Sequence, residues 1–507
     1  MRALTCLVAL SVGYLVSGTN GQIAEQRDPL PLQRPLGGLH EEQDSEFQYL
    51  TQQTRPFQVD GKKIPDVDFD VGESYAGLMP ISSDPHESRK LFFWFFPTSD
   101  TLGKDEITIW LNGGPGCSSF EGLLQENGPF LWQPGTFKPV KNPWSWTNLT
   151  NMIWVEQPVG TGFSQGTPSA TSEKDVAAQF LGFFKQFLDT FKMSNKKIYI
   201  TGESYAGYYV PYIADAMFNA RNTKYYDVQS TLIYDPVIAD DTLHTQVPAV
   251  AFLDYWAPLF GLDSSFMADI HFRANRCGYT SYLKDFLVFP PLGTLPFPPD
   301  PRTPGCDVFG DIFTAATVAN PCFNIYNIAT MCPLLWDVLG FPGSLAYLPP
   351  GAKIYFNRKD VKQAIHAPLS VQWAECTDNP VFNPADTSPP SSVSVLPSVI
   401  ERSKRTIISQ GMLDMRIITN GTLLAIQNMT WHGMMGFQSE PKDGFFVPYH
   451  PRGPLGTMAG AGIMGVTHTE RNLTWVTVQL AGHMYGLLSS QTSCSFNART
   501  RNRVQTN

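Results

Sequence analysis

The chain has 507 residues, of which 43% are hydrophobic and 16% are charged. This composition indicates a folded globular protein and excludes global disorder, and the length allows one large domain or two. The formal net charge is −9, which argues against nucleic acid as a partner and suits an acidic or extracellular setting.

Residues 1–18 are predicted to be a secretory signal peptide, because Arg2 precedes an apolar run from Ala3 to about Val16. A short N-terminal anchor is the alternative. No later run of about 18 uncharged apolar residues follows, so we expect no membrane association after signal removal. We therefore expect secretion, or alternatively delivery to an acidic, vacuole- or lysosome-like compartment. Residues 19–57 are polar with scattered proline and glycine, which favours a leader or disordered arm.

The cysteines favour disulfides, because no spacing of the zinc-binding type occurs, and we expect neither a metal site nor a cofactor. Cys6 leaves with the signal and seven cysteines stay, so at least one thiol should be unpaired or the chain end is unusual. Four closely spaced cysteines allow three pairings, among which the sequence does not choose: Cys277, Cys306, Cys322 and Cys332. Four N-x-S/T sequons agree with secretion as candidate glycosylation sites: Asn148, Asn420, Asn428 and Asn472.

From about residue 58, strands and helices alternate, which indicates an α/β core. Buried strands are expected at 91–96, 107–111, 152–155, 197–201, 406–409 and 473–480. Residues 175–191 carry one apolar stripe at helical period and predict a core-facing helix.

The expected organisation is a hydrolase core interrupted by an insertion. Its first part covers residues 58–239 and its second part residues 398–488. Between them, residues 240–397 are rich in aromatics and proline and hold five of the seven mature cysteines, which predicts a disulfide-stapled cap that shapes a binding cleft. Residues 489–507 form a polar, basic tail without an apolar period.

Ser204 is the candidate nucleophile. It lies in GESYAG, between the strand at 197–201 and an apolar helical segment, which is the context of a nucleophile elbow. The strict G-x-S-x-G pattern is not met, because Ala206 occupies its final position and Gly207 follows. A serine hydroxyl needs a base to remove its proton, and a carboxylate to orient that base.

The catalytic acid and the histidine base are expected in loops after late strands, in the chain order serine, acid, histidine. Asp414 follows the strand at 406–409, and His483 follows the strand at 473–480. His432, His450 and His468 also follow Asp414, but they are expected in loops without a leading strand. For the oxyanion hole, the strand at 107–111 ends in the glycine-rich NGGPGCSS, and the N–H of Tyr205 would supply a second donor.

Five spaced motifs together resemble the serine carboxypeptidases, from about residue 60 to His483. They are WLNGGPGCSS, ENGP, WVEQPVGTGFS, GESYAGYYVP and GHM. The resemblance implies an α/β-hydrolase fold, with a mixed, mostly parallel sheet flanked by helices. It also implies release of the last residue of a peptide or protein through an acyl-enzyme on Ser204.

The resemblance further implies particular roles for individual residues. Asp414 and His483 would complete the triad, and Gly114 and Tyr205 would form the oxyanion hole. The substrate carboxylate would be bound by the set Asn112, Gly113, Glu126 and Glu203, and Cys117 would pair with Cys376. A carboxyl group that receives a carboxylate must be protonated, and two neighbouring glutamates share protons, so activity should be favoured at acidic pH.

The chain departs from the family pattern after His483. Members usually continue GHMVP into a helix, whereas here the chain reads GHMYGLL and then a polar tail with Cys494, where no helix is expected. His483 would then lose the packing that follows it, which would leave the activity of the enzyme in doubt. The alternatives are an acyltransferase or esterase with the same triad, or a non-catalytic secreted binding protein. Neither the oligomeric state nor the preferred substrate side chain follows from the sequence, since the aromatic-rich insertion fits either packing or a bulky apolar pocket.

Overall fold

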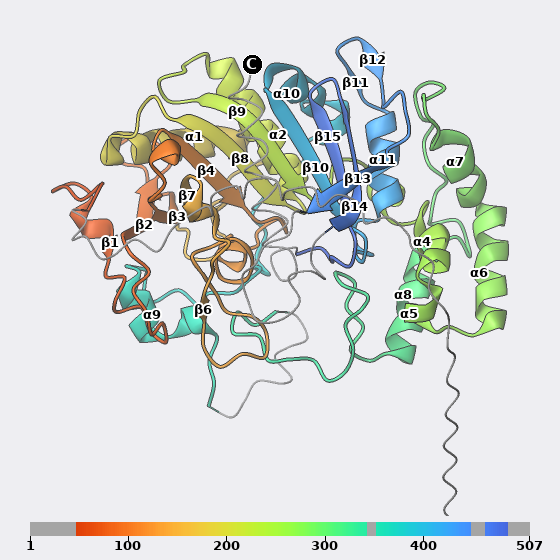
Figure 1. The fold of residues 1–507 in the computed structure, drawn as a ribbon, viewed down its shortest axis with the longest axis horizontal. Coiled ribbons are helices and arrows are strands. Elements are labelled where there is room, and N and C mark those ends of the chain that lie inside the picture. The colour runs from red at the N-terminus through yellow and green to blue at the C-terminus, as the bar shows by residue number, and fades with distance from the viewer. Residues whose placement is uncertain (1–46, 342–350, 448–461, 485–507) are drawn as a thin grey trace, which may run out of the picture. The chain divides into compact units, whose positions relative to one another are not determined.

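An 11-stranded mixed sheet forms the centre of the molecule (Figure 1). The computed structural model describes residues 47–341, 351–447 and 462–484. The strands of the sheet, in chain order, are β1 (Gln58–Val59), β2 (Ser74–Pro80), β3 (Lys90–Phe96), β4 (Glu106–Leu111), β7 (Asn151–Glu156), β8 (Lys197–Glu203), β9 (Asp227–Tyr234), β10 (Arg405–Gly411), β13 (Asp443–Val447), β14 (Gly462–Glu470) and β15 (Leu473–Val478). Two small hairpins are formed by β5 (Phe130–Leu131) with β6 (Val140–Lys141) and by β11 (Thr430–Trp431) with β12 (Met434–Met435).

The spatial order of the strands is β1-β2-β3-β7-β4-β8-β9-β10-β15-β14-β13. The six strands from β7 to β15 are parallel, and the strands at both edges are antiparallel. Because the carboxyl ends of parallel strands meet at one edge of a sheet, the loops after β4, β8, β10 and β15 open on the same side.

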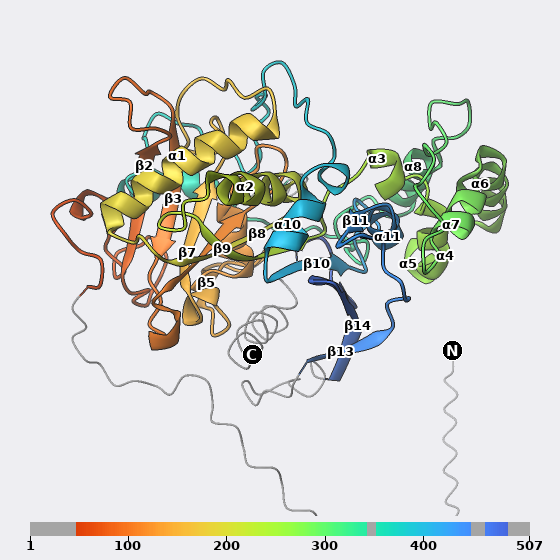
Figure 2. The ribbon, with the colours of Figure 1, turned by 90° about the horizontal axis from the view of Figure 1, so that it is seen from above.

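Helices cover the sheet and build the insertion. They are α1 (Glu173–Phe191), α2 (Ala206–Ala220), α3 (Asp241–His244), α4 (Ala249–Tyr255), α5 (Ala257–Phe260), α6 (Ser264–Cys277), α7 (Tyr279–Phe286), α8 (Val308–Ala319), α9 (Lys359–Ala364), α10 (Leu396–Arg402) and α11 (Thr419–Gln427). Figure 2 shows α1, α2 and α10 over one face of the sheet, and α4 to α8 gathered beyond its end. None of the described helices is long and apolar enough to cross a membrane.

Strand β3 shows why the central strands appear in the sequence as unbroken apolar runs. Phe93 points to the helical face, where its ring lies 5.3 Å from that of Phe187 in α1. Trp94 points to the opposite face, where its ring lies 6.0 Å from that of Phe120. Both faces are therefore covered, which requires apolar side chains at consecutive positions. The predicted strands are confirmed, except that the last one ends at Val478, and the helix predicted at 175–191 is confirmed and begins two residues earlier at Glu173.

The disulfides resolve the pairing that the sequence left open. Cys277 pairs with Cys306, and Cys322 pairs with Cys332, so each bridge closes a short loop within the insertion. The expected Cys117–Cys376 bridge is also present. Cys6 and Cys494 lie outside the described residues, as do the predicted signal peptide and the tail.

The arm predicted for residues 19–57 is wrong for its last part. Glu73 accepts hydrogen bonds from the backbone N–H groups of Gln48 and Tyr49, at 2.7 and 2.8 Å. The ring of Phe57 lies 5.6 Å from that of Phe93. Residues 47–57 are therefore packed on the sheet, because aromatic side chains within this polar stretch bury themselves on β2 and β3.

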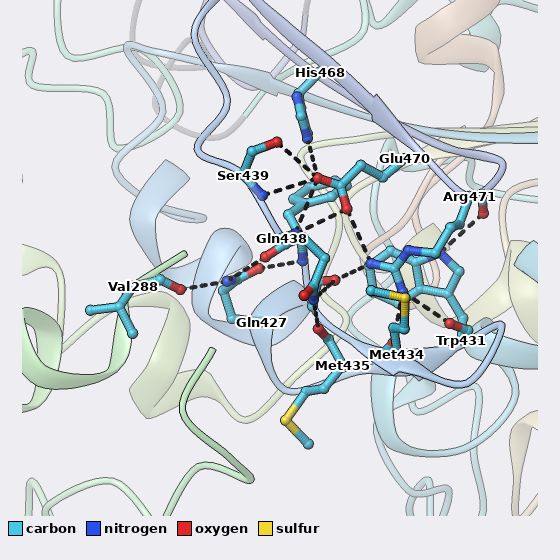
Figure 3. A network of polar contacts seen from close by, with 12 residues as sticks. Val288, Gln427, Trp431, Met434, Met435, Gln438, Ser439, His468, Glu470 and Arg471 are labelled. Carbon is cyan, nitrogen blue, oxygen red and sulfur yellow. Dashed lines mark hydrogen bonds and ion pairs between the residues drawn. The ribbon is translucent and has the colours of Figure 1, made fainter. Parts of the chain in front are cut away.

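His468 was expected in a loop but lies in β14, where its Nε2 is 2.8 Å from Glu470 Oε1 (Figure 3). Glu470 also accepts hydrogen bonds from the backbone N–H groups of Gln438 and Ser439 and from the guanidinium of Arg471. We call this group the Glu470 network. His468 therefore has a structural role in this network. His432 lies in the β11–β12 turn, and His450 lies outside the described residues.

Candidate active site

Ser204 occupies the sharp turn between β8 and α2, as the sequence predicts. Its φ is +62°, a left-handed conformation that non-glycine residues adopt only when their surroundings enforce it. The enforcing contacts are the hydrogen bond from Ser204 N to the carbonyl of Tyr234 and those from the N–H groups of Gly207 and Val237 to the carbonyl of Ser204, all 2.9 Å. A side chain at Gly207 would clash with the backbone carbonyl of Val237, so the elbow requires glycine there rather than at Ala206.

Asp414 and His483 are joined by a hydrogen bond of 2.7 Å between Oδ2 and Nδ1. Both are buried, and the other oxygen of Asp414 accepts from the backbone N–H groups of Arg416 and Ile417, at 2.7 and 3.2 Å. An ionised carboxylate only accepts, so Nδ1 of His483 donates and Nε2 is the acceptor. The loops carrying the two residues are neighbours because β10 and β15 pair directly.

His483 is held by the insertion. Its backbone N–H donates to the carbonyl of Tyr326 at 2.7 Å, and the two rings lie 5.1 Å apart. Next to Tyr326, the carbonyl of Ile325 accepts from Met415 N at 2.9 Å, so the same segment also supports the loop of Asp414. The packing expected to be lost involves the segment after His483, which lies outside the described residues, and the insertion supports His483 from another side. The strand before it ends at Val478, and Leu480 is exposed, contrary to the predicted strand at 473–480.

The glycine-rich loop after β4 passes directly over the elbow. A side chain at Gly113 would approach Ser204 Cβ and the carbonyl of Glu203 to 2.8 Å, so only glycine fits this crossing. The Cys117–Cys376 bridge follows, and Ser118 N donates to the carbonyl of Glu375 at 2.7 Å. The loop carrying Gly114 is thereby fixed beside Tyr205, the second predicted oxyanion donor.

Asn112 connects the loop to two glutamates. Its Nδ2 donates to Glu203 Oε1 at 2.8 Å and to Glu121 Oε2 at 3.2 Å. Its Oδ1 accepts from the indole N–H of Trp110 at 2.7 Å, which fixes the amide orientation. Asn112 and Glu203, two of the residues predicted to hold the substrate carboxylate, are therefore in contact. Glu203 directly precedes the candidate nucleophile Ser204.

Five buried acids surround this contact, and we call them the acid cluster: Glu121, Glu126, Glu203, Asp337 and Glu375. Each is at most 5% exposed. Burial raises the pKa of Glu203 well above its usual range, and the charges of Glu126, Glu121 and Asp235 raise it further. Burial likewise raises the pKa of Glu121, with the charge of Glu375 as the next cause, and the pKa of Glu375, with the charge of Asp337. Among the described residues, no cation offsets these charges for Glu121, Glu203 or Glu375.

A model of the family described as serine carboxypeptidase matches residues 65–500. The chain belongs to the serine carboxypeptidase family. It is 60% identical over 446 residues to a probable serine carboxypeptidase of Arthroderma benhamiae, covering 86% of this chain and 84% of that relative. It is 46% identical to serine-type carboxypeptidase F of Aspergillus niger, covering 87% and 85%.

The fold also matches a solved carboxypeptidase structure. The crystal structure of Kex1Δp, a prohormone-processing carboxypeptidase of Saccharomyces cerevisiae, superposes with a TM-score of 0.69 at 23% identity, covering 89% of this chain and 96% of that one. The predictions of an α/β-hydrolase fold and of a serine-type carboxypeptidase are confirmed. The predicted residue roles are separate questions and are taken up as proposals below.

The sequence did not indicate that Asp235 adjoins the triad. One side-chain atom each of Asp235, Asp414 and His483 lies within 4.8 Å of the others, a spacing that would also suit a metal ion. The hydrogen bond between Asp414 and His483 explains their proximity without an ion, and Asp235 Oδ1 already accepts from Gln410 Nε2 and Gly411 N, at 2.6 and 2.9 Å. Its position after β9, next to β10, is set by the sheet and leaves no spacing signal in the sequence.

One cavity contains none of the predicted site residues, and the four glycosylation sequons lie outside the site. This cavity has a volume of about 530 Å³ and is lined by Trp132, Trp336, Tyr355 and Arg358, among others. The sequons Asn148 and Asn472 are exposed, and Asn420 and Asn428 are partly buried. Asn428 Oδ1 accepts from Leu295 N at 2.9 Å, so its amide is engaged. Glycosylation at the four sites stays a prediction.

Proposed function

We propose that this serine carboxypeptidase releases the last residue of peptides through an acyl-enzyme on Ser204. His483 Nε2 takes the proton of Ser204 Oγ as that oxygen attacks the last peptide carbonyl. Asp414 holds the imidazole in the required tautomer and stabilises its positive charge. The buried hydrogen bond between Asp414 and His483 supports these roles.

The negative oxygen of the tetrahedral intermediate would be stabilised by the N–H groups of Gly114 and Tyr205. The intermediate collapses when His483 gives its proton to the nitrogen of the last residue, which leaves as a free amino acid. A water molecule, deprotonated by His483, then attacks the ester on Ser204 and regenerates the enzyme.

The substrate carboxylate would be held by Asn112, the N–H of Gly113, and the carboxyls of Glu126 and Glu203. The single observation that carries this proposal is the contact of Asn112 with a buried glutamate adjacent to the nucleophile. A protonated carboxyl donates to a carboxylate, whereas an ionised one repels it, so raised pKa values in the acid cluster suit the task. Binding would therefore be favoured at acidic pH, as in a secreted or vacuolar enzyme.

The proposal is tested with a fluorophosphonate serine probe and a pair of blocked dipeptides, one with a free C-terminal carboxylate and one as its amide. We expect labelling of Ser204, and hydrolysis of the acid at least about 100-fold faster than release from the amide, since a charge-assisted hydrogen-bond set of this kind contributes a few kcal/mol. Ser204→Ala is the control and should lose both signals. Equal rates on acid and amide would contradict the carboxylate-binding role, and absence of labelling would contradict the nucleophile.

A further inference from the structure

Three members of the acid cluster, Glu121, Asp337 and Glu375, are not required by the proposed reaction. Glu126 and Glu203 suffice to receive a carboxylate, yet Glu121 and Glu375 lie beside them, each 5% exposed. Oε1 of Glu121 and Oε2 of Glu375 are buried without a hydrogen-bond partner among the described residues. An unpaired buried carboxyl oxygen is costly, which points to a ligand that supplies a donor.

Their position relative to the triad identifies the part of the substrate that would meet them. Tyr326 packs against the ring of His483. Burial raises the pKa of Tyr326, and the charges of Asp414, Glu121 and Glu375 raise it further against the opposing charge of Arg416, so all three acids lie near this ring. Glu121 also accepts from Asn112, the proposed carboxylate ligand. Glu121 thus adjoins the group that would bind the substrate carboxylate, and both acids act electrostatically on the ring that packs against His483.

The leaving residue has its carboxylate at Asn112 and its nitrogen at His483, so its side chain starts from the carbon between those points. That side chain would extend toward Glu121 and Glu375. A lysine ammonium or an arginine guanidinium would supply donors to both carboxyls and the positive charge that the described residues do not provide.

We propose that Glu121 and Glu375 form the subsite for the side chain of the last residue, and that the enzyme prefers peptides ending in lysine or arginine. This specificity rests on the proposed carboxypeptidase reaction. Asp337 is a supporting charge and not a direct ligand, because Gln125 Nε2 and Leu339 N already donate to it, at 2.9 and 2.8 Å. When the substrate cation binds, the protons of Glu121 and Glu375 are released to water.

The Cys117–Cys376 bridge explains how the two acids come together. Glu375 precedes Cys376, and the backbone N–H of Ser118, the residue after Cys117, donates to the carbonyl of Glu375. The bridge therefore fixes the segment of Glu375 against the loop that leads into Glu121. The proposed subsite is acidic and not apolar. The aromatic residues of the insertion are therefore assigned to packing.

The test compares side chains of similar length that differ in charge. Blocked dipeptides ending in lysine and norleucine form one pair, and those ending in arginine and citrulline form the other. We expect kcat/KM to be at least tenfold higher for the charged member of each pair at pH 6. In Glu375→Gln the ratio should fall toward one, while turnover of the norleucine peptide persists and shows that the variant is folded.

Glu121→Gln provides a second, independent variant with the same expected loss of preference. Glu440→Gln, at an exposed glutamate, is the matched control and should keep the wild-type ratio. The ratio should also increase from pH 4 to pH 6.5 in the wild type, because Glu121 faces Glu375, Glu126 and Asp337, and Glu375 faces Asp337, so all lose protons late.

A wild-type ratio of one or less, or an unchanged ratio in both variants, would overturn the specificity. Failure to hydrolyse any of the four peptides would instead overturn the proposed reaction.

Discussion

Glu470 and Glu121 are both shielded from bulk water, but their surroundings are electrostatic opposites. Burial alone would raise the pKa of Glu470, yet hydrogen bonds from Gln438 N, His468 and Ser439 outweigh it and lower the pKa to about 2 (Figure 3). Arg471, whose guanidinium lies 4.0 Å from the ring centre of Trp431, adds a cation to this site. Glu121 instead faces three further acids, and its pKa is raised.

The difference separates a carboxylate that supports the fold from carboxyls that are kept for a ligand. The Glu470 network supplies every donor that its carboxylate needs, so nothing remains to be bound. The acid cluster leaves donors and positive charge to be supplied by the substrate, at a cost in stability that functional sites commonly carry.

The largest expected effect is on substrate binding by the acid cluster. For the norleucine peptide, KM should rise as the pH climbs past neutrality, because an ionised carboxyl no longer donates to the substrate carboxylate and repels it. Steady-state kinetics across pH 4–8 measures this rise. Glu203→Gln should flatten the profile, since the amide donates at every pH. A KM that stays constant from pH 4 to 8 in the wild type would contradict the roles of Glu126 and Glu203.

Glu121→Gln should stabilise the protein at pH 7 and leave the free energy of unfolding nearly unchanged at pH 4, because burial and the charge of Glu375 raise the pKa of Glu121 well above its usual range. The folded-state pKa of Glu121 lies above its ordinary value of 4.5, so its contribution to stability is present below pH 4.5 and is lost as the pH rises. Urea unfolding at both pH values measures the difference. An equal change at pH 4 and pH 7 would mean that packing, not charge, is the cause.

Glu470→Gln should have the opposite sign. The pKa of about 2 places the stabilising effect of Glu470 above pH 4.5, with loss as the pH falls toward 2. We expect a loss of about 1–2 kcal/mol at pH 7, typical of hydrogen bonds to a charged group, and a smaller loss at pH 3. The same urea titrations check this, and a loss that grows on acidification would contradict it.

The smallest effect is expected at an exposed pair that resembles neither site. Lys185 Nζ lies 2.7 Å from Asp189 Oδ2 on α1, and both side chains are more than 40% exposed. Lys185→Ala should change the free energy of unfolding by about 0.5 kcal/mol or less, and 1 M NaCl should remove the difference. A larger effect would mean that exposed charges rival the buried ones.

Much of the fold could be predicted because the parallel strands are covered on both faces. Their apolar runs, as in β3, stand out from the polar loops, and the phenylalanine stripe of α1 is unambiguous. Strand β14 could not be recognised, because its glycine, methionine and threonine residues belong to an antiparallel edge region with incomplete burial. The packing of Phe57 was missed because a few aromatic residues in a polar stretch decide it.

The contact between Asp414 and His483 could be predicted because the order of strand ends in the sequence fixes which loops meet. Glu203 could be predicted only through the family resemblance. Glu375 and Asp337 could not, because each comes near Glu121 through tertiary contacts of the insertion, and no local spacing records that approach. Asp235 was missed for the same reason.

The segment around Tyr326 has a practical consequence for engineering. Exchanging the insertion between relatives is a natural way to alter specificity, since it carries Glu375. The same exchange would replace the backbone carbonyls that receive His483 N and Met415 N, and would thereby re-aim the proton-transfer machinery. Grafted insertions should therefore be selected on turnover number as well as on substrate preference, with residues 325–328 retained from the recipient.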